Sequence, residues 1–249
     1  KGISEEQIAE QLACFEKGFP YLKLSAAASV EKGILAPDTD EQKKYLDAWE
    51  AYTQTDKVVV KFVPASGAAS RMFKNLFEFL GADYDAPQTG FEKTFFENIE
   101  KFAFYDDLNT ACRRTAGKDI SALLAAGNYK AVVAALLEGA GLNYGALPKG
   151  LLKFHKYEDG SRTPLEEHLV EGALYAVNKN GKVNVHFTVS PEHRALFKAL
   201  VDEKAAAYAK KYGVDYNITF SEQKPSTDTI AADMENKPFR DNGKLLFRP

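Results

Sequence analysis

Apolar residues alternate with polar residues in two stretches of the chain, and a third stretch is almost wholly apolar. The alternating stretches are residues 183–189 and 214–220, and the apolar stretch is residues 57–63. Alternation with a period of two is typical of β-strands, and so is a short apolar run of this length. Residues 190–213 have helical spacing, so this strand, helix and strand predict a parallel crossover unit.

Helical spacing of the apolar side chains dominates two longer segments. Ile8, Leu12 and Phe15 recur at helical intervals within residues 1–55, and residues 75–146 show no clear strand pattern. Apolar residues three or four positions apart form one face of a helix. Both segments are therefore predicted to be helical.

Two shorter elements are predicted after the second helical segment. Residues 151–157 are a strand candidate. Thr163 and Glu166 have the spacing of a capping box, and Pro164 stands between them at the first helical position, which predicts a helix start.

Together these patterns predict an α/β protein with a three-layer, Rossmann-like, mainly parallel sheet, N-terminal helices and a large helical insertion. The predicted parts are a helical segment, an interrupted α/β core and the insertion: residues 1–56, residues 57–74 with 147–249, and residues 75–146. Ligands of parallel sheets bind beyond the carboxyl ends of the strands. We therefore expect a site in the loops that follow residues 63, 189 and 220.

A loop of small residues follows the first predicted strand and leads into a predicted helix. Its sequence is Pro64-Ala65-Ser66-Gly67-Ala68-Ala69-Ser70-Arg71-Met72. Backbone N–H groups and the helix dipole converge at such a turn and favour a bound anion. A second candidate phosphate ligand, Lys149, follows Pro148 far along the chain. The alternative is an ordinary turn between strand and helix with Arg71 in solvent.

These two segments resemble the signature of the nucleotidyltransferase superfamily, the sugar-phosphate pyrophosphorylases. The family pattern is a strand, Gly-x-Gly-Thr-Arg-Met/Leu, a spacer and Pro-Lys. Gly67–Met72 resembles the first part, with Ala69 in place of the second glycine and Ser70 in place of the threonine. Residues 148–154 resemble the second part, and residues 160–168 resemble the segment that follows it. The chain departs from the family in its spacer, which is usually short and here contains the helical block.

The resemblance implies an uncharacterised bacterial branch with a nucleotidyltransferase-like core, whose partners are a nucleoside triphosphate and a phosphorylated small-molecule acceptor. Arg71 would contact the β- and γ-phosphates, and Lys149 would neutralise charge near the α-phosphate. Mg²⁺ would be needed to neutralise the developing charge, although no metal ligand is identified. The residues implied to bind the nucleotide through the loop are Ser66, Gly67, Ala68, Ala69 and Ser70.

A polar segment after the third predicted strand resembles the Phe-x-Gln…Pro segment of the UDP-sugar branch. The resemblance implies that Gln223 contacts the base or the sugar. The alternative is a capped turn in which Ser226, Thr227 and Asp228 bond to local backbone groups. In that branch another motif follows, and the chain stops at Pro249 where it would begin, so we expect an N-terminal fragment.

The activity that the resemblance implies is the joining of a nucleoside triphosphate to a sugar phosphate or similar acceptor, with release of pyrophosphate. One alternative is a non-catalytic nucleotide or sugar-phosphate sensor, which the altered loop favours. Another alternative is a structural interaction protein whose helical insertion contacts its partner.

Composition narrows these possibilities. The 249-residue chain has a net charge of −3 and no basic stretch, which argues against a dedicated nucleic-acid binder. It has no apolar run long enough to span a membrane and no signal-like start. Cys14 and Cys112 lack metal-type spacing and are predicted to be buried free thiols, which fits a cytoplasmic protein. The oligomeric state does not follow from these features.

Other candidate chemistry is weaker. The four histidines are scattered without metal spacing. Asp38-Thr39-Asp40 resembles a glycosyltransferase metal-binding pair, but it precedes the first strand and predicts a turn instead. Ser66 lacks a nucleophile-elbow sequence, and the order of residues reveals no carboxylate–histidine pair.

Overall fold

The structure is a computed structural model that describes residues 2–248. Internal contacts divide the chain into two compact units, Lys1–Thr55 with Gln223–Pro249 and Asp56–Glu222. We call the first the terminal unit and the second the α/β unit. The predicted domain boundaries remain predictions.

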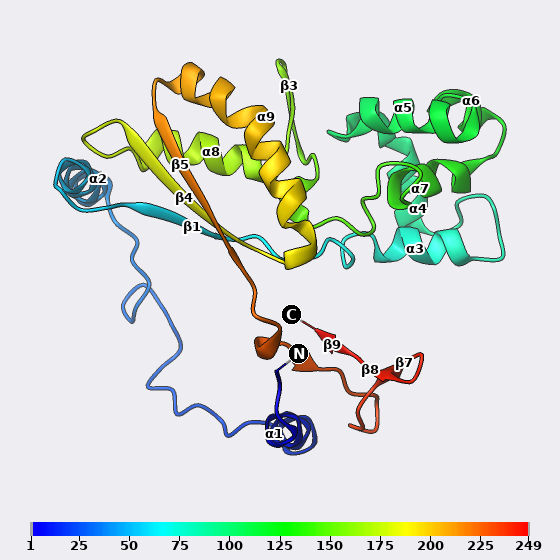
Figure 1. Cartoon of the computed structure of the whole chain (residues 1–249), viewed down its shortest axis with the longest axis horizontal. Coiled ribbons are helices and arrows are strands. Elements are labelled where there is room, and N and C mark those ends of the chain that lie inside the picture. The colour runs from blue at the N-terminus through cyan, green and yellow to red at the C-terminus, as the bar shows by residue number, and fades with distance from the viewer. Residues whose placement is uncertain (1, 249) are drawn as a thin grey trace. The chain divides into compact units, whose positions relative to one another are not determined.

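The α/β unit contains a parallel three-stranded sheet (Figure 1). Its strands are β1 (Val60–Pro64), β4 (Lys182–Val189) and β5 (Asp215–Glu222), in the order β1-β4-β5. Both neighbouring pairs are parallel. The strand pattern thus predicted the α/β class and the direction of the strands correctly.

Two helices cover one face of this sheet. They are α8 (Pro164–Tyr175) and α9 (Arg194–Tyr212), and each packs on the sheet as well as on the other. Val185 and Phe187 on β4 are buried beneath them, and Phe187 lies 6.2 Å from Phe197 of α9 between ring centroids. Thr163 caps α8 in the predicted capping box, so local sequence sets where this covering layer begins.

The other face of the sheet is only partly covered. Phe62 of β1 is 62% exposed and stacks on His186 of β4. The two ring nitrogens of His186 lie 2.8 Å from the hydroxyls of Thr219 and Ser221 on β5. The structure therefore shows an α/β unit with helices packed on one sheet face, and it does not confirm the predicted three-layer, Rossmann-like arrangement.

A block of helices lies between β1 and α8 in the sequence (Figure 1). It has its own core, which is rich in phenylalanine. The predicted helical character of residues 75–146 is confirmed. The helical elements are α3 (Lys74–Gly81), α4 (Gly90–Glu97), η1 (Ile99–Lys101), α5 (Tyr105–Ala116), α6 (Ile120–Ala125) and α7 (Tyr129–Leu137).

The strand predicted for residues 151–157 is largely wrong. A 3₁₀ turn, η2 (Lys149–Leu151), comes first, and only β2 (His155–Tyr157) is a strand, paired antiparallel with β3 (Gly160–Arg162). The apolar pattern has another cause: Leu151 packs against the core beneath the sheet, whereas Leu152 is buried in the helical core. The segment links two cores, and burial in them accounts for its apolar residues without a strand.

The terminal unit contains helices α1 (Glu5–Lys17) and α2 (Thr39–Thr53) together with short strands. Gln11 of α1 accepts a hydrogen bond from the N–H of Ile230 at 2.8 Å. Asp38 caps α2 by accepting from the N–H groups of Asp40 and Glu41, so the segment predicted to be a turn is the start of a helix. The remaining short elements are η3 (Pro191–His193), η4 (Pro225–Thr227), β6 (Thr229–Ile230), β7 (Arg240–Asp241), β8 (Lys244–Leu245) and β9 (Phe247–Arg248).

Among the described residues, no helix combines the length and the apolar character that crossing a membrane requires.

Candidate anion-binding site

The small-residue loop after β1 and the segment around Lys149 lie against each other. The N–H of Lys149 donates to the carbonyl oxygen of Gly67 at 3.0 Å, and Ala68 and Pro148 form an isolated antiparallel bridge. The loop leaves the carboxyl end of β1, where Ala65 donates to the carbonyl of Thr188 at 2.7 Å. The structure therefore brings together two segments that are far apart in sequence, at the sheet edge where ligands of parallel sheets bind.

A hollow of about 140 Å³ lies where these segments meet. Gly67, Lys149 and His168 contribute to its lining, and the fully buried rings of Phe187 and Phe197 also border it. Pockets for whole small molecules hold roughly 300–1,000 Å³. The hollow therefore suits a single compact group, such as a phosphate, better than an entire nucleotide. Its apolar wall lowers the local dielectric constant and strengthens electrostatic contacts with such a group.

Two cations of this region are available for an anion. Arg71 and Lys149 are both exposed, and neither is ion-paired to a carboxylate within residues 2–248. Over the same residues, the N–H groups of Ser66, Gly67 and Ala68 donate to no protein acceptor. Unused backbone donors beside unpaired cations are the two features that an anion needs.

Gly67 and Gly150 border the same hollow, but they differ in their surroundings. A Cβ atom added at Gly67 would meet no atom within 4 Å, and the backbone there is not left-handed. A Cβ at Gly150 would lie 2.8 Å from two ring atoms of Phe197. Packing against Phe197 thus explains why residue 150 is a glycine. At Gly67 no such packing exists, and the space next to the loop is open.

The other loop residues predicted from the sequence lie outside the lining of the hollow. Ala69 is buried in the helical core, which means its side chain serves packing. Ser70 and Arg71 belong to a turn, and α3 begins at Lys74, a few residues later than the pattern predicts. Gln223 directly follows β5 and belongs to the terminal unit.

The structure adds a histidine–carboxylate pair that sequence reasoning missed. Nδ1 of His168 lies 3.3 Å from Oε2 of Glu171, one helical turn along α8. The Nζ of Lys61 on β1 lies 2.5 Å from the same Glu171 oxygen. Tyr175 is hydrogen-bonded to Lys61 as well. The signal available in the sequence was the three-residue spacing of His168 and Glu171 in a helix marked by its capping box.

Burial and charge set the protonation states of this pair. Burial lowers the pKa of His168, and the nearby Lys61 charge lowers it further, although the hydrogen bond with Glu171 opposes both. The hydrogen bond from Lys61 lowers the pKa of Glu171. A neutral imidazole that donates from Nδ1 to an ionised carboxylate keeps Nε2 as an acceptor. His168 lines the hollow, and in this tautomer it would carry a hydrogen-bond acceptor.

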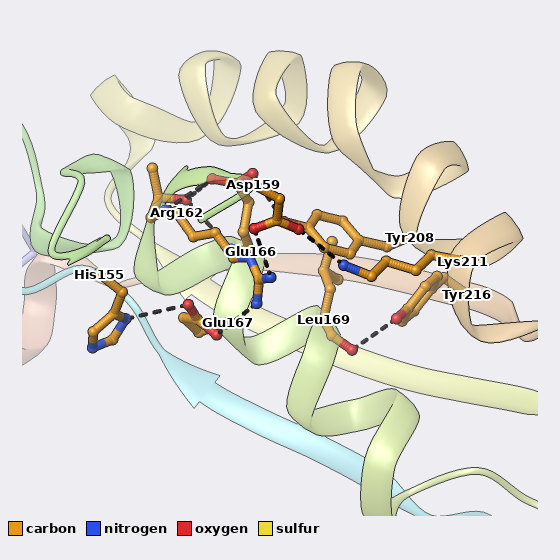
Figure 2. Close-up of polar contacts among 10 residues, drawn as sticks. His155, Asp159, Arg162, Glu166, Glu167, Leu169, Tyr208, Lys211 and Tyr216 are labelled. Atoms are coloured by element: carbon orange, nitrogen blue, oxygen red, sulfur yellow. Dashed lines mark hydrogen bonds and ion pairs between the residues drawn. The ribbon is translucent and has the colours of Figure 1, made fainter. Parts of the chain in front are cut away.

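A second polar cluster, between the β2–β3 hairpin and helices α8 and α9, is charge-compensated (Figure 2). Arg162 lies 3.7 Å from Glu167 and 3.5 Å from Asp159, and its guanidinium lies over the Tyr157 ring. Asp159 also pairs with Lys211 of α9 at 3.2 Å. Because its cations are already paired, this cluster ties the hairpin to the helices and offers no free charge for an anion.

No group of three or more histidine, cysteine or carboxylate side chains in residues 2–248 is placed to hold a metal ion. Mg²⁺ in nucleotide sites is usually held by one or two carboxylates together with phosphate oxygens, so the Mg²⁺ that the resemblance implies stays a prediction.

Comparison with known proteins identifies the family of this chain. Residues 1–249 match the model of the family described as Domain of unknown function (DUF4301), and the chain belongs to that family. No curated protein matches the chain significantly, and no solved structure does either. These comparisons add no support to the resemblance to nucleotidyltransferases.

Proposed function

We propose that this member of the DUF4301 family is a nucleotidyltransferase-like protein that joins a nucleoside triphosphate to a sugar phosphate or similar acceptor and releases pyrophosphate. The observation that supports the proposal most is the 3.0 Å hydrogen bond from Lys149 to Gly67. This bond joins two backbones, and both residues line the same hollow, which brings a residue with an unpaired cation to a loop with free N–H groups at the carboxyl edge of a parallel sheet.

Each residue of the region has a role in the proposed reaction. The N–H groups of the loop donate to phosphate oxygens, and Arg71 and Lys149 offset their charge. Hydrogen bonds to charged groups contribute roughly 1.5–3 kcal/mol each, and arginine suits phosphate because it donates in a fork. His168 lines the same hollow as Lys149 and would accept a hydrogen bond from a protonated oxygen of the phosphate bound there.

The proposal includes three expectations that stay untested. Gln223 would contact the base or the sugar. The sheet would be part of a three-layer arrangement, with a further layer over the face that carries Phe62 and His186. Mg²⁺ would accompany the nucleotide.

Thermal unfolding with added nucleotide tests binding. A ligand at a hundred times its Kd stabilises the folded state by roughly 2.7 kcal/mol, and each kcal/mol raises Tm by about 2–4 °C at this chain length. We expect a rise of about 5–11 °C with at least one nucleoside triphosphate, with or without Mg²⁺. Lys149→Ala and Arg71→Ala should lose most of this rise. Lys118→Ala, which removes another exposed lysine, is the matched control and should keep it.

Pyrophosphate release separates catalysis from binding. The proposed activity predicts nucleotide-dependent release of pyrophosphate when a sugar phosphate is added. A thermal shift without release with any sugar phosphate would instead support the second candidate, a non-catalytic sensor. A sensor would need only the loop and the two cations, Arg71 and Lys149, to bind its ligand. If no nucleotide shifts Tm, the nucleotidyltransferase and the nucleotide sensor are both rejected.

A further inference from the structure

A large apolar cavity opens inside the helical block, apart from the hollow at Lys149. Its volume is about 510 Å³. Six phenylalanines, Met72 and Leu76 line it, and no titratable side chain does. Close-packed protein interiors have few voids larger than a water molecule. An apolar space of this size is within the range of small-molecule sites, roughly 300–1,000 Å³.

The lining offers few hydrogen bonds to a guest. The side-chain amide of Asn98 already donates to the carbonyl of Thr94 at 2.8 Å, and its oxygen accepts from Lys101 at 2.7 Å. A guest rich in hydroxyl or amide groups would lose its bonds to water here without replacing them. The side chains that line the cavity therefore favour a hydrocarbon guest over a polar one.

The rim of the cavity reaches solvent. Met72 and Phe91, which both line it, are 45% and 42% exposed. A polar group attached to the hydrocarbon can therefore remain in water. Met72 directly follows Arg71, so a cation without an ion-pair partner in residues 2–248 stands next to the rim in sequence.

We propose that this cavity binds the hydrocarbon part of a small amphiphilic anion. At roughly 30 Å³ for each water-sized group, the volume holds on the order of 17 such groups. A medium-length acyl chain and a fused aromatic ring system are two sources of hydrocarbon that fit. The site goes beyond the proposed nucleotide chemistry and does not depend on it.

The test uses isothermal titration with decanoate as the chain probe and 2-naphthoate as the ring probe. Gly90 lines the cavity at the start of α4, and a Cβ there would meet no atom within 4 Å. Gly90→Phe should fill the cavity and weaken binding at least tenfold. Gly81→Phe is the matched control, because Gly81 also faces open space but lies outside the lining. It should bind as the wild type does.

A second cavity-filling variant keeps the proposal testable if the first variant does not fold. Thr94→Phe changes another lining residue, and circular dichroism would show whether each variant is folded. One-to-one binding of either probe, lost in both filling variants, supports the proposal, and the tighter probe identifies the chain or the ring as the source. Lys149→Ala should bind both probes normally, which distinguishes this site from the hollow.

Three results would overturn the proposal. The first is that neither probe binds to the wild type. The second is that a folded Gly90→Phe or Thr94→Phe variant binds as tightly as the wild type. The third is that the wild type self-associates and these variants do not, which would make a second copy of the chain the occupant.

Discussion

Replacing Gly150 by alanine tests the packing beneath the hollow. The added Cβ would lie 2.8 Å from both Cε1 and Cζ of Phe197, closer than real Cβ contacts. Phe197 is fully buried, and its ring packs near that of Phe187, so it has little room to retreat. Overpacking of this kind costs about 1–3 kcal/mol. At about 2–4 °C per kcal/mol, Tm should fall by about 2–12 °C.

Gly67→Ala is the matched comparison at the same hollow. Its Cβ meets no atom within 4 Å, and the residue does not have a left-handed backbone conformation. Restricting the unfolded chain should then stabilise the protein by about 0.4–1 kcal/mol. The same methyl group should weaken pyrophosphate binding, because it enters the space next to the loop.

Urea denaturation of the wild type and both variants measures these differences directly. The opposite signs matter more than either magnitude, because the two substitutions are chemically identical. If Gly150→Ala is as stable as the wild type, or if Gly67→Ala loses as much stability as Gly150→Ala, the geometry assigned to the hollow is wrong.

Three further predictions concern titrating groups. Lys61→Met should raise the pKa of His168, because the Lys61 charge adds to burial in lowering it; an NMR titration of the imidazole that shows no rise would contradict the network. Burial raises the pKa of the Cys112 thiol to about 11, so this thiol should react with a disulfide reagent only after unfolding, and rapid reaction in the native protein would contradict its burial. Burial would raise the pKa of Glu92, but hydrogen bonds from the N–H groups of the preceding turn lower it more. Its ionised form should therefore stabilise the fold above the ordinary carboxyl pKa and lose this effect as the pH falls. Glu92→Gln should then be destabilising near pH 7 and progressively less so in acid; a cost independent of pH would refute this.

Periodicity predicted the sheet and the helical block because each element carries its own pattern. Residues 183–189 alternate because one sheet face is buried under helices, and the capping box at Thr163 is local chemistry. The segment at 151–157 misled the same reasoning, because Leu151 and Leu152 belong to different cores. Apolar residues in a short segment report burial, and burial of neighbouring residues in two different cores does not require a strand.

Only part of the candidate site could be predicted from the sequence, namely its loop of small residues and its lysine. The small residues around Gly67 mark a turn that can receive an anion, and a proline–lysine pair stands out as a possible partner. The three-residue spacing of His168 and Glu171 within α8 is visible in the sequence, but the pairing of Glu171 with Lys61 depends on how α8 lies on β1. Contacts between side chains of different elements do not leave a periodic trace in the sequence.

The proposed function requires the loop at Gly67 and the segment at Lys149 to bind one phosphate group together. Amide NMR spectra recorded during a titration with pyrophosphate test it residue by residue. The account predicts that the amide signals of Gly67, Ala68 and Lys149 shift with a single common Kd, and that Lys149→Ala weakens this binding. Shifts confined to other parts of the chain, or separate affinities at the two segments, would contradict it.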